Sequence, residues 1–267
     1  CRQQLALSHS AQHARDANTV TPGLSLDWWL LPLSGASEHH LAGWAAWHAR
    51  SMVLAWAILM PVGALFARYW KLTPRQNWPE SLDNKTWWRV HQWCQNGGFW
   101  LMVIGMVLAW NQGTRHNLVA QWHHWLGWSI VGTATLQVVS GMFRGSRGGP
   151  GEVDARGDHY DMSARRRRFE IWHKTAGWLV LAISIVVIVL GLVAADAPRW
   201  MPGVLTVWWI TLAALASLWQ RQGRCIDTYE AIWGDDENHP GNRIKPIGYG
   251  VRRAREQLKR RPPTSSL

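Results

Sequence analysis

Apolar residues gather in five long runs, separated by polar stretches that contain glycine and proline. These runs predict five helices, at about residues 44–70, 87–110, 122–143, 171–195 and 202–221. At about 1.5 Å per residue, each helix would be long enough to cross a hydrocarbon layer of about 30 Å. The run Leu179–Ala195 carries no charge, which is hard to reconcile with a small water-soluble core. The pattern therefore predicts an all-α integral membrane fold, with a membrane domain over residues 41–221.

Polar segments flank this membrane domain on both sides. We expect residues 1–40 to form an extracytoplasmic arm, in which the short apolar segment 24–33 lies in the membrane interface because it is too short to span. Residues 222–267 form a basic tail, which we expect on the cytoplasmic side. Its last part, Arg252–Arg261, is dense in charge, and we expect it to be disordered or ordered only by a partner.

Pro61 lies inside the first predicted helix. Proline removes one backbone donor and should bend the helix at this point. Membrane helices tolerate the change when a neighbouring segment satisfies the freed carbonyl group, so we expect a contact of that kind here.

Positive charge is unevenly divided between the segments that join the helices. Residues 71–86, 145–168 and 222–267 hold eighteen Lys and Arg, whereas the segments at the opposite ends of the helices hold four. We expect a multi-pass protein of the bacterial inner membrane, and this asymmetry predicts a periplasmic N-terminus and a cytoplasmic C-terminus. Many of the 22 Trp lie at the run ends, as in interfacial belts. The net charge of +11 then follows from topology, and we expect no nucleic acid partner.

The three cysteines bear on processing and on cofactor chemistry. A chain that begins at Cys1 matches a lipoprotein cut before a lipid-carrying cysteine, and it equally matches a trimmed chain; both interpretations stay open. Cys94 and Cys225 are expected to be reduced packing residues. The sequence has no Cys-x-x-Cys-His, which excludes covalent attachment of a c-type haem.

Four histidines lie near the starts of the first four predicted helices: His48, His91, His123 and His173. An ionisable ring is costly in hydrocarbon and needs a partner. If consecutive helices run antiparallel, His48 faces His123 near one membrane surface, and His91 faces His173 near the other. Two such pairs can form two bis-imidazole haem sites stacked across the membrane, with the histidines as iron ligands.

Glycines follow three of these histidines on the same helix face. Gly98 lies seven residues after His91, and Gly127 and Gly177 lie four residues after His123 and His173. A missing side chain at these positions would leave room for a flat macrocycle, so we include all three in the predicted cofactor site. His124 is the alternative to His123, because adjacent helical residues diverge by about 100°. The glycine register favours His123.

Basic residues near the histidines have two interpretations. Arg50 and Arg89 are candidates for neutralising the propionates of a bound haem, and they could equally anchor the helix ends at the membrane surface. Weaker candidates for the propionate role are Arg68, Arg144 and Lys174. The run Arg165–Arg168 reads as a topological anchor or as a docking element, and the anchor is the simpler interpretation.

Several stretches resemble the cytochrome b561 family, over roughly residues 44–195 plus a fifth helix. They are Ile58-Leu-Met-Pro-Val-Gly-Ala, Ala67-Arg68-Tyr69, Trp88-Arg-Val-His91, His123-His-Trp-Leu-Gly127, Ala134-Thr-Leu-Gln137, and Trp172-His173 with Gly177. The resemblance is to the five-helix eukaryotic form, here without an attached ligand-binding sandwich domain. It implies two non-covalent b haems, ligated by His48 with His123 and by His91 with His173. It also implies electron transfer across the membrane.

Three functions compete on these observations. The preferred one is a transmembrane electron carrier between a cytoplasmic-side or quinone-pool donor and an outer-face acceptor, with separate electron-transfer proteins or quinol as partners. The second is a membrane anchor or assembly subunit of a larger complex, in which haem has a structural role. The third is an enzyme in its own right, such as a quinol or metal reductase, and the sequence alone does not decide whether the chain is an enzyme.

Overall fold

The computed structural model describes residues 25–36, 40–112, 117–149 and 156–259, and these ranges are built from helices. The long helices are α3 (Gly43–Val53), continued by the π-helical segment η1 (Leu54–Leu59) and α4 (Met60–Tyr69), then α5 (Thr86–Ala109), α6 (Leu118–Met142), α7 (Ala164–Ala194) and α8 (Trp200–Arg221). Short elements complete the description: α2 (Leu26–Leu30), α9 (Thr228–Trp233), the 3-10 turn η2 (Pro240–Arg243) and α10 (Ala254–Lys259). Cys1 lies outside the described residues.

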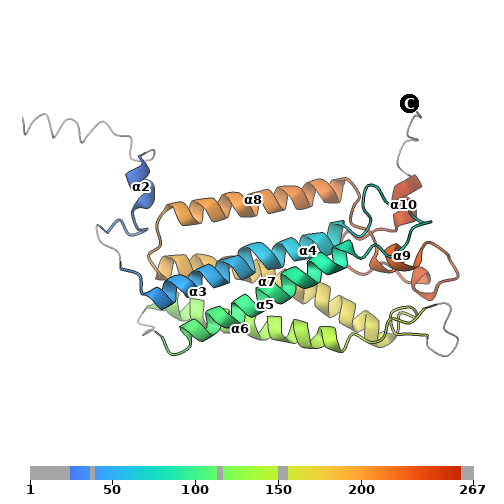
Figure 1. Cartoon of the computed structure of the whole chain (residues 1–267), viewed down its shortest axis with the longest axis horizontal. Coiled ribbons are helices and arrows are strands. Elements are labelled where there is room, and N and C mark those ends of the chain that lie inside the picture. The colour runs from blue at the N-terminus through green and yellow to red at the C-terminus, as the bar shows by residue number, and fades with distance from the viewer. Residues whose placement is uncertain (1–24, 37–39, 113–116, 150–155, 260–267) are drawn as a thin grey trace, which may run out of the picture.

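The long helices run side by side along the length of the molecule (Figure 1). α5 packs along the continuous helix α3–η1–α4, and α6 packs along α7, while fewer contacts join these two pairs. Trp56, Met102 and Ile130 are buried in the core between the pairs. α8 lies along one edge of the bundle and buries only Leu205 among its residues.

Three helices of the described chain are long and apolar enough to cross a membrane: Gly43–Tyr69, Ala164–Ala194 and Trp200–Arg221. α5 and α6 are of similar length, and they expose large apolar side chains such as Trp93, Trp100 and Leu136. Both helices carry polar residues, near the start of α5 and along the whole of α6, which lowers their mean hydropathy. The chain is a multi-pass helical membrane protein.

The expected disturbance at Pro61 takes the form of the π-helical segment directly before it. Proline has no N–H to donate to the carbonyl of Ala57 four residues earlier. The indole Nε1 of Trp208 on α8 donates to this carbonyl instead, at 2.7 Å. The expected neighbour for the freed carbonyl is therefore present, and it ties the peripheral α8 to the bundle.

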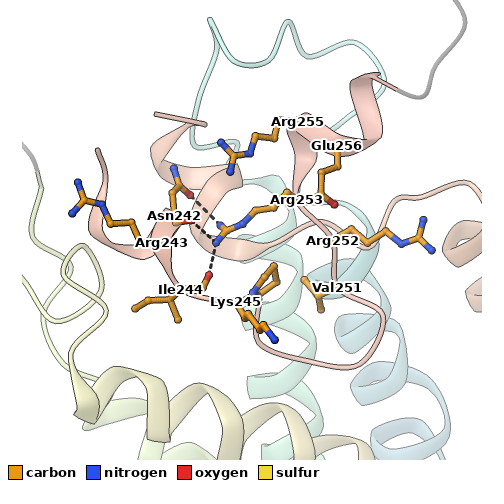
Figure 2. A pocket seen from close by; sticks show the side chains of 10 residues that line it. Asn242, Arg243, Ile244, Lys245, Val251, Arg252, Arg253, Arg255 and Glu256 are labelled. Carbon is orange, nitrogen blue, oxygen red and sulfur yellow. Dashed lines mark hydrogen bonds between the residues drawn. The ribbon is translucent and has the colours of Figure 1, made fainter. Parts of the chain in front are cut away.

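The tail after α8 folds into a cap over one end of the bundle. The Arg253 guanidinium is buried and donates to the carboxylate of Asp227 at 2.9 Å, to the Asn242 side chain at 3.0 Å and to the backbone carbonyl of Ile244. Figure 2 shows this guanidinium enclosed by the segment that carries Asn242 and Ile244. The expectation of disorder from Arg252 onward is wrong for the described part of the tail, because Arg253 finds partners for most of its five donors.

Two further bonds fasten the cap to loops between the helices. Lys71 is buried and donates from Nζ to the carbonyl of Ile226 at 2.9 Å. The hydroxyl of Tyr229 donates to the carbonyl of Tyr160 at 2.7 Å. The cap therefore joins the loop after α4, the segment before α7 and the tail.

The opposite end of the bundle is covered by the short segment around α2 rather than by a folded cap. The backbone N–H and the hydroxyl of Ser34 donate to the two carboxylate oxygens of Asp196, at 2.8 and 2.6 Å. The guanidinium of Arg199 lies over the ring of Trp28 at 4.6 Å. These contacts fix the segment around α2 to the turn between α7 and α8, while Leu26 and Leu30 stay exposed.

Candidate functional site

The first histidine pair joins α3 and α6 near the lightly covered end of the bundle. The ring centroids of His48 and His123 lie 6.1 Å apart, with an interplanar angle of 80°. Each ring donates from Nδ1 to a backbone carbonyl of a neighbouring helix, His48 to Gly105 at 2.8 Å and His123 to Val187 at 2.9 Å. A carbonyl only accepts, so the proton is on Nδ1 and the lone pair on Nε2 is free to bind a metal.

The second pair joins α5 and α7 near the capped end. The ring centroids of His91 and His173 also lie 6.1 Å apart, at 83°. His91 donates from Nδ1 to the carbonyl of Gly63 at 3.1 Å. His173 differs, because its Nδ1 is buried without a hydrogen-bond partner in the described chain and its ring stacks on Phe169 at 5.2 Å.

The spacing within each pair fits a shared metal ion. A metal–imidazole bond of about 2 Å, plus about 1 Å from the nitrogen to the ring centre, places two rings on one metal about 6 Å apart. Among the described residues, no group of three or more His, Cys, Asp or Glu could hold a metal. Two protein ligands per site suit a metal whose remaining ligands belong to a macrocycle, as in haem.

Buried polar atoms without partners support the same fit. Both amide atoms of Gln137 are buried and lack a hydrogen bond within the described residues. Gln137 lies fourteen residues after His123 on α6, which is about 21 Å further along the helix and therefore near the level of the second pair. An orphaned amide is costly in a membrane core. A bound group with polar substituents would remove this cost. Sequence reasoning named Gln137 within a stretch of the family resemblance but gave it no role.

Hydrogen bonds between the helices fix the separation of the two pairs. On α5, His91 of the second pair lies fourteen residues before Gly105, whose carbonyl accepts a hydrogen bond from His48 of the first pair. On α7, His173 of the second pair lies fourteen residues before Val187, whose carbonyl accepts a hydrogen bond from His123 of the first pair. Both helices therefore place the two pairs about 21 Å apart along the bundle axis.

Glycines that sequence reasoning did not place beside the rings bring the helices close to them. A Cβ on Gly191 would lie 2.8 Å from Cε1 of His123, and a Cβ on Gly63 would lie 2.7 Å from Cβ of Cys94. Gly63 and Gly105 also present the carbonyls that hold His91 and His48. Gly63 belongs to the Leu-Met-Pro-Val-Gly stretch, which was the one available signal for this role.

The three predicted glycines have different surroundings. A Cβ on Gly127 or Gly177 would meet nothing within 4 Å, so space is open beside both. A Cβ on Gly98 would lie 2.9 Å from Cγ of Met60. The space beside Gly98 is therefore filled by Met60, and this glycine allows α5 to pack closely on α4 rather than clearing a surface for a macrocycle.

The structure also places the other candidates of the sequence analysis. His124 points to Trp125 and Trp128, with ring centroids 5.2 and 6.3 Å away, while His123 faces His48. Arg50 is exposed and lies over the ring of Trp47 at 5.0 Å. Arg89 is exposed, and no contact with a histidine ring places it in the site.

The three weaker basic candidates lie at the capped end. Arg144 lies over the ring of Trp88 at 4.9 Å. Arg68 donates to the carbonyl of Tyr249 at 2.5 Å, and Lys174 donates to the carbonyl of Ile247 at 2.9 Å. Arg68 and Lys174 therefore hold the tail against the bundle next to the second pair.

A buried charge cluster underlies the second pair, and sequence reasoning missed it. The carboxylate of Glu170 is buried and accepts from Arg166 at 3.0 Å and from Lys174 at 2.7 Å. His159 Nε2 lies 4.0 Å from the same carboxylate. Burial, and to a smaller extent the positive charge of Arg166, lowers the pKa of His159 to about 3. This ring is therefore neutral at ordinary pH. Burial and then the charge of Lys174 lower the pKa of Lys71 to about 8.

Comparison with known proteins agrees with this arrangement. The family profile described as eukaryotic cytochrome b561 matches residues 47–197. A cytochrome b561 and DOMON domain-containing protein of Arabidopsis thaliana is 32% identical over 151 residues, which cover 54% of this chain and 27% of that protein. A cytochrome b561, DM13 and DOMON domain-containing protein of the same plant is 24% identical over 145 residues, which cover 54% of this chain and 14% of that protein.

This chain spans about a quarter or less of the length of these two relatives. No solved structure matches it. The profile match covers more than half of the residues, and all four paired histidines lie within it. The chain belongs to the cytochrome b561 family.

Proposed function

We propose that this chain carries electrons across a membrane through two b haems, one ligated by His48 with His123 and the other by His91 with His173. Membership of the family implies transmembrane electron transfer through haem. The observation that carries the residue assignment is the spacing of 6.1 Å in both pairs, with three of the four rings held as Nε2 ligands by backbone carbonyls. When bound, haem iron supplies a one-electron couple.

The chain's own residues have three tasks in this proposal. The carbonyls of Gly63, Gly105 and Val187 orient the ligand rings. The apolar core around Trp56 and Met102 excludes water between the two levels. At the capped end, the Arg166–Glu170–Lys174 cluster sets the local potential, and the exposed Arg50 and Arg89 remain candidates for pairing with propionates.

The proposed membrane arrangement has five spans, formed by α3–η1–α4, α5, α6, α7 and α8. The lopsided distribution of Lys and Arg supports a cytoplasmic capped end and a periplasmic opposite end in a bacterial inner membrane. In this orientation a cytoplasmic-side or quinone-pool donor would reach the second pair, and an outer-face acceptor would reach the first.

A second candidate function rests on α8. This helix buries only Leu205 of its residues, and it exposes Val204, Val207 and Ile210 among others. Such a face suits a partner subunit, so the chain could serve as a haem-containing membrane anchor of a larger complex. Stable co-purification with other subunits would favour this function over independent electron transfer.

A reduced-minus-oxidised absorption spectrum of the purified protein, with pyridine haemochrome quantitation, tests the preferred function. The chain should bind two b haems, and His91→Ala and His123→Ala should each remove one. His124→Ala is the matched control, because its ring faces Trp125 and Trp128, and it should retain both haems. A folded wild-type protein without haem would contradict the proposal, as would loss of haem in the control alone.

A further inference from the structure

A pocket of about 370 Å³ lies between the first turns of α7 and the tail. Its walls are Ala164, Arg167, Arg168 and Ile171 from α7, and Ile244 and Ile247 from the tail. Its lining is almost wholly apolar, and the two exposed arginines stand at its rim; residues far apart in the sequence form it. None of the histidine pairs takes part in it.

The two arginines of this pocket are the unused half of the Arg165–Arg168 run. Arg165 donates to the carbonyl of Phe143 at 2.9 Å, and Arg166 donates to Glu170 at 3.0 Å. Arg167 and Arg168 are exposed, and their side chains form no ion pair or hydrogen bond within the described chain. Two adjacent free cations at one pocket favour an anionic group with several acceptor oxygens.

The rest of the pocket is apolar and held in place. The carbonyl of Ile247 accepts from Lys174, and the carbonyl of Ile244 accepts from Arg253, so both carbonyls are satisfied within the protein. The side chains of both isoleucines line the pocket. Ile171 forms the wall on α7 and remains 54% exposed. A soluble anion would leave this apolar wall wet, whereas a hydrocarbon chain would cover it.

The pocket also lies at the correct depth for a lipid. Arg167 and Arg168 are in the first turns of the apolar helix Ala164–Ala194, and Ile171 is one turn further into it. Cations therefore lie at headgroup level and the apolar wall lies toward the hydrocarbon, as in basic pockets that hold anionic lipid headgroups. We propose that this pocket binds an anionic phospholipid, with its phosphate between Arg167 and Arg168 and an acyl chain against Ile171 and Ile247.

A neighbouring basic cavity of about 310 Å³ is a poorer candidate. It contains Arg243, Arg252 and Arg255, but Arg243 and Arg255 already donate to Glu237, and Figure 2 shows Arg252 pointing to the opposite side. Arg253, in the centre, is already satisfied by Asp227, Asn242 and backbone carbonyls. No two free cations converge there on one phosphate.

Lipid retention by the purified full chain tests the proposal. The protein is exchanged from detergent into mixtures of phosphatidylglycerol and phosphatidylcholine, and native mass spectrometry counts the bound lipids. Wild type should retain one phosphatidylglycerol in preference to phosphatidylcholine. The double variant Arg167→Gln with Arg168→Gln should reduce this retention on the order of tenfold, because two charge-assisted contacts are lost.

Matched variants separate a specific pocket from general attraction. Arg75→Gln with Arg221→Gln removes the same charge from exposed positions outside the pocket and should leave retention unchanged. Ile247→Ser keeps both arginines and should still weaken phosphatidylglycerol binding severalfold.

Full retention in the Arg167/Arg168 variant, or equal loss in the Arg75/Arg221 control, would overturn the proposal. A third outcome would also overturn it: millimolar inorganic phosphate displaces the lipid, and Ile247→Ser has no effect on binding. The ligand would then be a soluble anion. The single arginine variants, each with partial loss expected, maintain the test if the double variant does not fold.

Discussion

The two histidine pairs share a spacing of 6.1 Å but differ in what surrounds them. In the first pair both rings donate to backbone carbonyls, and the nearby end of the bundle carries few charges. In the second pair one ring lacks such a partner, and the Arg166–Glu170–Lys174 cluster on α7, with its buried carboxylate, lies beside it at the capped end. Backbone geometry alone therefore suffices to position a ligand pair, while side-chain charge can be added at one end to give it different properties.

The largest expected effect would remove one site and leave the other. Gly191→Val puts a branched side chain where even a Cβ would lie 2.8 Å from the His123 ring. The variant should lose one of two haems, from the first pair, as measured by pyridine haemochrome per mole of protein. Gly132→Val is the control, because a Cβ there meets nothing within 4 Å. Loss of both haems, or of neither, would contradict the separate positioning of the two pairs.

The charge cluster should affect only the second pair. Glu170→Gln leaves Arg166 and Lys174 without their shared carboxylate, which should cost about 3 kcal/mol of unfolding free energy. The added positive charge should raise the reduction potential of the haem at His91 and His173. A redox titration of both haems measures the effect, and Glu237→Gln at an exposed ion pair is the control. A shift of equal size at both haems would refute the difference between the two ends.

Acid should weaken the capped end through His159. Its pKa is lowered to about 3 in the folded protein, whereas the unfolded side chain titrates near its ordinary value of 6.5. The unfolded state therefore binds the extra proton between pH 6.5 and 3, so unfolding free energy falls as the pH drops through this window. From pH 6.5 down to about pH 4.5 the loss should be on the order of 2–3 kcal/mol. His159→Phe should flatten this dependence in denaturant titrations at several pH values, and an unchanged slope would show that His159 does not cause it.

The smallest expected effect falls on both pairs alike. Trp208→Phe removes the donor to the Ala57 carbonyl, and it should lower the unfolding free energy by about 1 kcal/mol. Because this bond lies in the middle of the bundle, the spectra of both haems should change little and equally. A selective change at one pair would mean that α8 supports that end in particular. Thermal unfolding followed at the haem absorption band measures both quantities.

Sequence reasoning reached the helices and the facing of the histidines because both depend on local pattern and on alternating helix direction. It could not identify Gly105, Gly191 and Val187 as neighbours of the rings, since those contacts depend on the register between helices. For Gly98 it predicted room for a macrocycle, whereas Met60 on another helix fills the space.

The tail illustrates a different limit. A run dense in arginine has the composition of a disordered segment. Arg253 is ordered because Asp227 and Asn242, distant in sequence, meet it only after the chain has folded. Glu170 was overlooked for a different reason: its partners Arg166 and Lys174 lie four residues before and after it on α7, a spacing that the sequence shows, and only the contact with His159 depends on the fold.

The carbonyl bonds to the rings divide the protein into two preassembled halves. α3–η1–α4 with α5 forms one hairpin, in which His48 and His91 are oriented by Gly105 and Gly63. α6 with α7 forms the other, in which Val187 orients His123. Contacts within each hairpin are extensive and those between the hairpins are sparse. Cofactor loading would therefore act as the final cohesive step of biogenesis, and cofactor scarcity would leave the two hairpins prone to separation.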